Sequence, residues 1–115
     1  MVARLRRKQF RWGHAVTFLS QFTDDMYLEA PVNGRLDYQV WGVTADRKYT
    51  VIARISVSHP KLPDEEDAPE TKRSFRTIEA LKRDPDYKRI ERCEPEEFEP
   101  SLTVFDEMLD SLTIR

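Results

Sequence analysis

The sequence predicts an α+β fold, a curved antiparallel sheet of four to six strands with two helices packed on one face. In the first half, apolar and polar residues alternate with the period of two that is typical of a strand with one buried face. In the second half, apolar residues recur three and four positions apart, the spacing of a helix with one buried side. Strands followed by helices are typical of an α+β domain.

Length and composition indicate a single globular unit. A chain of 115 residues suits one domain. Its 39% hydrophobic content is too high, and its net charge of −2 too small, for a wholly disordered chain. The single cysteine excludes an internal disulfide. We therefore expect one α+β domain over residues 13–115, preceded by a basic N-terminal arm over residues 1–12.

That N-terminal segment is the only strongly basic stretch. We expect it to be either a partly mobile arm or an edge strand. Arginines neutralise phosphates and neighbouring aromatic rings can stack on bases, so the segment is a weak nucleic-acid candidate. The chain as a whole is slightly acidic, with a pI near 5.7, which favours pairing of these cations with the domain's own acids. The cations are Arg4, Arg6, Arg7, Lys8 and Arg11.

The sequence was also searched for segments that direct a protein to a membrane or out of the cytoplasm. The basic start is not followed by the apolar stretch of a signal peptide, and no apolar run is long enough to span a bilayer. We therefore expect a cytoplasmic protein without a membrane span. The alternative is the cell envelope, if a signal peptide precedes Met1.

Three strands are predicted in the first half. Residues 15–22 form one, and the connection after it contains Asn33-Gly34, a pair that readily takes a turn. Residues 36–58 then form a hairpin, with a turn over residues 44–48. In its first strand, Tyr38 faces one way with Leu36 and Val40, whereas Trp41 faces the other way with Val43.

The second half is predicted to be helical between proline-rich connections. Residues 59–70 hold three prolines and five acids and should form a surface loop. A helix over residues 71–83, capped by Thr71, and another over about residues 100–111 follow from their apolar spacing. Residues 87–93 leave a helical turn and a strand equally open. Residues 112–114 are a candidate closing strand.

No residue set has the pattern of a catalytic, metal or cofactor site. His14, His59 and Cys93 have no close ligand spacing, so no zinc site is predicted, and Cys93 is expected to be an ordinary, half-buried cysteine. The serines lack the turn that exposes a nucleophile, and no glycine loop is present to hold phosphates. We therefore predict no catalytic residue, no metal and no cofactor; the sequence favours a protein that is not an enzyme but leaves this open.

The strongest candidate site is an aromatic sheet face made of Tyr38, Trp41 and Tyr49. An antiparallel sheet commonly leaves one face to solvent, where tryptophan and tyrosine can anchor a partner. The favoured alternative is that helices or a long loop cover Trp41 and Val43, and a dimer interface is a third interpretation.

Several segments resemble a group of uncharacterised bacterial envelope proteins. Those proteins share a strand that reads Tyr-x-x-x-Gly-hydrophobic-Thr-x-Asp-Gly-x-Tyr and a later Pro-x-Leu-Pro loop. Here the matching residues run from Leu36 to Tyr49 and over residues 57–63, with further likeness at 18–22, 31–33, 98–102 and 105–112. Arg47-Lys48 stands where the group has its glycine turn. More distantly, the final helix and Ser-Leu-x-Ile resemble the PsbP-like α/β/α sandwich. The resemblance implies a fold and a binding role, not a reaction.

Three hypotheses of function follow. The first is a non-enzymatic binding or adaptor domain that contacts a protein partner, or a second copy of itself, through the aromatic sheet face. The second is a small-molecule binder or enzyme with a pocket between the sheet and the helices. The third is nucleic-acid contact through the basic segment, which the acidic balance of the chain disfavours.

Overall fold

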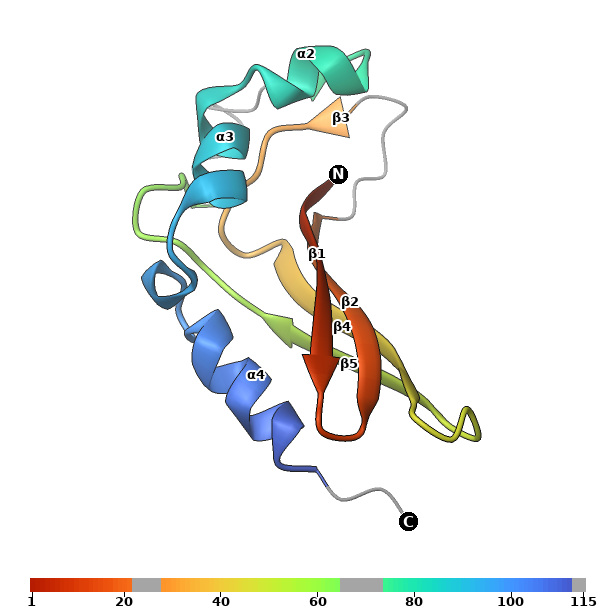
Figure 1. Ribbon diagram of the computed structural model, residues 1–115. Coiled ribbons are helices and arrows are strands. Elements are labelled where there is room, and N and C mark those ends of the chain that lie inside the picture. Colours follow the sequence, from red (N-terminus) through yellow and green to blue (C-terminus); the bar gives the residue numbers. More distant parts are fainter. Residues whose placement is uncertain (22–27, 65–73, 113–115) are drawn as a thin grey trace.

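The computed structural model describes residues 1–21, 28–64 and 74–112, and it confirms the predicted α+β fold. Within these residues the chain forms a four-stranded antiparallel sheet, a small two-stranded sheet, three α-helices and one 3₁₀ turn (Figure 1). In chain order the elements are β1 (Val2–Phe10), β2 (Gly13–Gln21), β3 (Leu28–Glu29), β4 (Leu36–Thr44), β5 (Thr50–Ser56), β6 (Ser74–Phe75), α2 (Ile78–Lys82), α3 (Pro85–Arg92), η2 (Pro95–Glu97) and α4 (Leu102–Asp110).

The main sheet has the strand order β1-β2-β4-β5, with every neighbouring pair antiparallel. The predicted hairpin is confirmed, because β4 pairs with β5 across the turn that follows Thr44. The N-terminal segment is the edge strand β1, not an arm extending from the domain. Its register shifts between Ala3 and Arg6, where Arg4 has a φ of 54°, so a bulge interrupts this edge of the sheet.

One face of the sheet forms the core with α4. Leu19 of β2 and Val40 of β4 are fully buried there, and Phe105 of α4 packs edge-on against Tyr38. Trp12, in the β1–β2 turn, donates its indole N–H to the carbonyl of Leu109 at 2.9 Å. The alternating pattern of β2 and the helical spacing of α4 therefore bury each other. Figure 1 shows α4 alongside the sheet, with α2 and α3 beyond one end of it.

The helices begin at polar caps. Ser101 accepts a hydrogen bond from Val104 N at the start of α4, which confirms the predicted C-terminal helix. Asp84 caps α3 and Pro85 occupies its first turn, so the segment that the sequence left open is helical. The helix predicted over residues 71–83 is shorter in the structure, where α2 begins at Ile78 after the cap Thr77. Phe75, which was predicted to be helical, lies in β6 and pairs with Leu28 of β3. The predicted cap Thr71 lies outside the described residues.

Four further expectations concern the acidic loop, the closing strand, Cys93 and a membrane span. Half of the predicted acidic loop and most of the predicted closing strand fall in residues 65–73 and 113–115, outside the described residues. Cys93 is half-buried, as expected. Among the helices that the structure describes, none is long and apolar enough to cross a membrane.

Candidate functional site on the open sheet face

The second face of the main sheet carries an exposed row of side chains that crosses all four strands. The register aligns Arg7 of β1, Val16 of β2, Trp41 of β4 and Ile52 of β5 side by side. Val16 is 37% exposed, Trp41 48% and Ile52 60%. Such a face is normally polar in a soluble sheet. This row is apolar from Val16 to Ile52, and none of the described helices covers it. We call this side of the sheet the open face.

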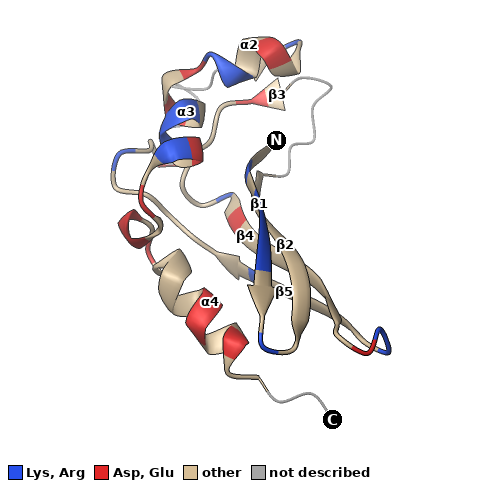
Figure 2. Cartoon of the chain, in the orientation of Figure 1, with Lys and Arg blue, Asp and Glu red and all other residues tan. Residues whose placement is uncertain are grey.

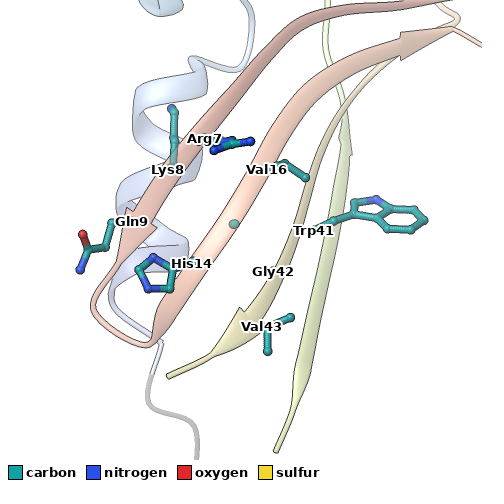
Figure 3. A pocket seen from close by; sticks show the side chains of 9 residues that line it. Arg7, Lys8, Gln9, His14, Val16, Trp41, Gly42 and Val43 are labelled. Atoms are coloured by element: carbon teal, nitrogen blue, oxygen red, sulfur yellow. The ribbon is translucent and has the colours of Figure 1, made fainter. Parts of the chain in front are cut away.

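A groove of about 580 Å³ lies along this face. Figure 3 shows Trp41 projecting from β4 on the side of the sheet away from α4. Among the described residues, its lining includes two cations and a histidine but no carboxylate. These residues are Arg7, Lys8, Gln9, His14, Ala15, Val16, Trp41, Gly42 and Val43.

The indole of Trp41 is held in a defined orientation although it is exposed. Its N–H donates to Gln39 Oε1 at 2.8 Å, on the same strand and the same face. Its ring is tilted by 49° against Phe18, with the ring centroids 6.2 Å apart. A contact residue that is already ordered loses little conformational entropy when a partner binds. Because Trp41 is exposed, the expectation that a helix or loop covers it is wrong for the part of the chain that is described.

Tyr38 does not belong to this face, and its inclusion in an aromatic contact surface is wrong. It is 1% exposed and points into the core. Its hydroxyl donates to Asp106 Oδ1 of α4 at 2.8 Å. Burial raises the pKa of this hydroxyl far above its ordinary value. Tyr38 thus fastens α4 to the sheet.

Tyr49 is exposed but lies away from the groove. It comes directly before β5 and shares a small recess with Trp12, Thr44 and Asp46, on the side of the sheet where Trp12 packs against Gly42. Its exposed fraction of 49% is nearly that of Trp41. The structure therefore separates the three predicted aromatic residues, and of these only Trp41 lies on the open face.

The basic segment is mostly neutralised within the domain. Arg6 pairs with Glu91 of α3, Lys8 with Asp106 and Arg11 with Asp110 of α4. Figure 2 shows this basic strand beside the acidic residues of α4. Arg4 donates its guanidinium to the carbonyls of Ile90 and Cys93. Arg7 has neither an acidic partner nor a carbonyl partner among the described residues, and its side chain lines the groove.

The fold also brings together a group of residues that the sequence does not connect. His59, Cys93 and Glu97 place one potential ligand atom each within 4.8 Å of the others. The sequence shows only that Cys93 and Glu97 are four residues apart. No local signal links them to His59, which lies 34 positions before Cys93, so the prediction that these residues have no ligand spacing did not anticipate the cluster.

Comparisons with known proteins add no identity to this geometry: no family model, curated protein or solved structure matched the chain. The resemblance to bacterial envelope proteins and to the PsbP-like sandwich stays a prediction from the sequence. The function must therefore be argued from the site.

Proposed function

We propose that this chain is a non-enzymatic binding domain whose contact surface is the open face, with Trp41 as its anchor. The observation that carries the proposal is the exposed apolar row from Val16 through Trp41 to Ile52, on a sheet whose other face already forms the core. An apolar row of this kind marks a surface that a partner covers. Tryptophan is among the residues that contribute most to such contacts.

The lining of the groove supports a partner of particular chemistry. Its floor is apolar, its rim has the cation Arg7 and the exposed His14, and no acid is among the described residues that line it. Complementary charge guides association and disfavours partners of the wrong sign. The best fit is a protein segment with an apolar side chain flanked by carboxylates.

The other hypotheses have less support. The groove lies on the open face and not between the sheet and the helices. Among the described residues that line it there is no serine, threonine or cysteine, and the amine of Lys8 is paired with Asp106. Nucleic-acid contact through the basic segment is disfavoured because Arg6, Lys8 and Arg11 are already paired with acids.

A random peptide library displayed on phage and selected on the immobilised chain tests the proposal. We expect enrichment of peptides that combine an apolar anchor with acidic residues. Replacing an anchor at the centre of a contact costs about 2 kcal/mol or more, so Trp41→Ala should weaken the selected peptides by roughly 30-fold. Raising the salt concentration should weaken them further, because the charges are exposed.

Tyr49→Ala is the matched control. It removes an aromatic ring of nearly equal exposure, and it lies outside the groove lining. Peptides that bind the wild type and Tyr49→Ala equally but lose affinity for Trp41→Ala would support the proposal. Equal binding to all three proteins would refute it. Sedimentation velocity of the same proteins tests the self-association alternative, in which wild-type dimers would dissociate on loss of Trp41.

A further inference from the structure

A buried histidine lies where three segments of the chain meet, away from the open face. His59 follows β5 and is fully buried. Its backbone is fixed by Asn33, which accepts from His59 N at 2.8 Å and donates to His59 O at 2.9 Å. Its ring packs edge-on against Phe98, with the ring centroids 5.3 Å apart. The imidazole is therefore held in one place and one orientation.

The two ring nitrogens have different surroundings. Nδ1 accepts a hydrogen bond from the backbone N–H of Lys61 at 3.1 Å. Nε2 is buried and has no hydrogen-bond partner among the described residues. The nearby Glu97 Oε1 lies 3.5 Å away, longer than an ordinary N–H···O bond. A buried polar atom without a partner is rare and requires an explanation.

The other two members of the cluster are also fixed in place. Cys93 ends α3, where its N–H donates to Arg89 O at 2.8 Å and its carbonyl accepts from Arg4 at 2.6 Å. Glu97 uses Oε2 to accept from Glu94 N at 2.8 Å, which leaves Oε1 toward His59. The thiol, the imidazole nitrogen and the carboxylate oxygen thus converge from two separate parts of the chain.

We propose that His59 Nε2, Cys93 Sγ and Glu97 Oε1 bind one zinc-type divalent metal ion. Sulfur, imidazole nitrogen and carboxylate oxygen are the atoms that zinc takes in proteins. Two ligands that are each about 2.0–2.2 Å from a tetrahedral ion are about 3.4 Å apart. The observed 3.5 Å between Nε2 and Oε1 already matches that separation. Three protein ligands leave the fourth position for water or a ligand.

Metal binding requires two proton movements, one at Cys93 and one at His59. The thiolate is the form of cysteine that binds a metal, so the Cys93 thiol releases its proton to solvent when the ion binds. The hydrogen bond from Lys61 places the proton of the neutral ring on Nε2. Coordination moves that proton to Nδ1 through solvent and breaks the bond to Lys61, which is one neutral hydrogen bond exchanged for a metal–nitrogen bond.

Titration of the full, untagged chain with Co²⁺ tests the proposal. Because the chain has a single cysteine, a thiolate-to-cobalt charge-transfer band can arise only from Cys93. We expect this band and the visible bands of tetrahedral cobalt to saturate at one ion per chain, and Zn²⁺ to displace the cobalt. Cys93→Ser should abolish the charge-transfer band. Saturation without that band would overturn the proposal.

Glu97→Gln is the decisive variant, because His59 variants risk unfolding. Glutamine keeps an oxygen that can accept from Glu94 N, so the turn is retained. We expect at least a tenfold loss of Co²⁺ affinity for Glu97→Gln and no change for Glu96→Gln, whose carboxylate instead accepts from Thr103. Zn²⁺ should also slow the reaction of Cys93 with a thiol reagent in the wild type. Equal affinity in both variants would refute the site.

Discussion

Tyr38 and Tyr49 allow a direct test of which side of the hairpin is buried. Replacing each by phenylalanine removes one hydroxyl and keeps the ring. The hydroxyl of Tyr38 donates to Asp106 at 2.8 Å and is buried, whereas Tyr49 is 49% exposed. We therefore expect Tyr38→Phe to lower the free energy of unfolding and Tyr49→Phe to leave it unchanged.

The magnitude follows from the charge of the acceptor. A hydrogen bond to a charged group contributes about 1.5–3 kcal/mol. Asp106 keeps its ion pair with Lys8 after the hydroxyl is removed, so the lower limit applies, about 1.5 kcal/mol. In a domain of this length that loss lowers Tm by about 6 °C.

Urea unfolding measures the effect. Tyr38→Phe should lower the transition midpoint without changing the slope, since the exposed surface on unfolding is the same. A double-mutant cycle with Asp106→Asn should give a coupling energy of about 1 kcal/mol. If Tyr38→Phe and Tyr49→Phe unfold within 0.5 kcal/mol of each other, about the error of such comparisons, the packing of α4 described above is incorrect.

Three other outcomes are expected. Arg47 has a φ of 63° in the hairpin turn, so Arg47→Gly should raise the free energy of unfolding by about 0.5–1 kcal/mol, and thermal unfolding that shows destabilisation would contradict this. A Cβ at Gly42 would lie 2.8 Å from His14 O and 2.7 Å from Trp12, so Gly42→Ala should cost about 1–3 kcal/mol in urea unfolding. The pKa of Tyr38 is higher in the fold than in the unfolded chain, because the fold favours the neutral hydroxyl. This contribution to stability is complete below the unfolded pKa of about 10 and decreases as the pH rises above it. The wild type should therefore lose stability above pH 10 more steeply than Tyr38→Phe, and parallel pH curves would contradict this.

Elements whose signals are local could be predicted from the amino-acid sequence alone. Alternation over residues 36–58 predicted the β4–β5 hairpin because successive side chains on a strand point to opposite faces. The spacing of Leu102, Phe105 and Leu109 predicted α4 because residues three and four apart share one side of a helix.

Local signals were weaker where tertiary pairing competes with propensity. Phe75 fits the helical spacing of residues 71–83, yet it pairs with Leu28 in β6. The helix therefore begins at Ile78, after the cap Thr77. The sequence likewise left the basic segment as either an arm or an edge strand. Its cations pair with Glu91 and Asp106 from helices that are distant in the sequence, which no local signal indicates.

Which face of the sheet is covered, and which distant residues meet, depends on the packing of elements that are far apart in the sequence. Alternation separates Tyr38 from Trp41 but does not say which of the two faces α4 covers. The packing of α4 decided this, since it buries Tyr38 and leaves Trp41 exposed. His59 and Cys93 are brought together by the same long-range packing, which no spacing in the sequence encodes. Periodicity specifies the sides of each element, whereas burial depends on which elements pack together.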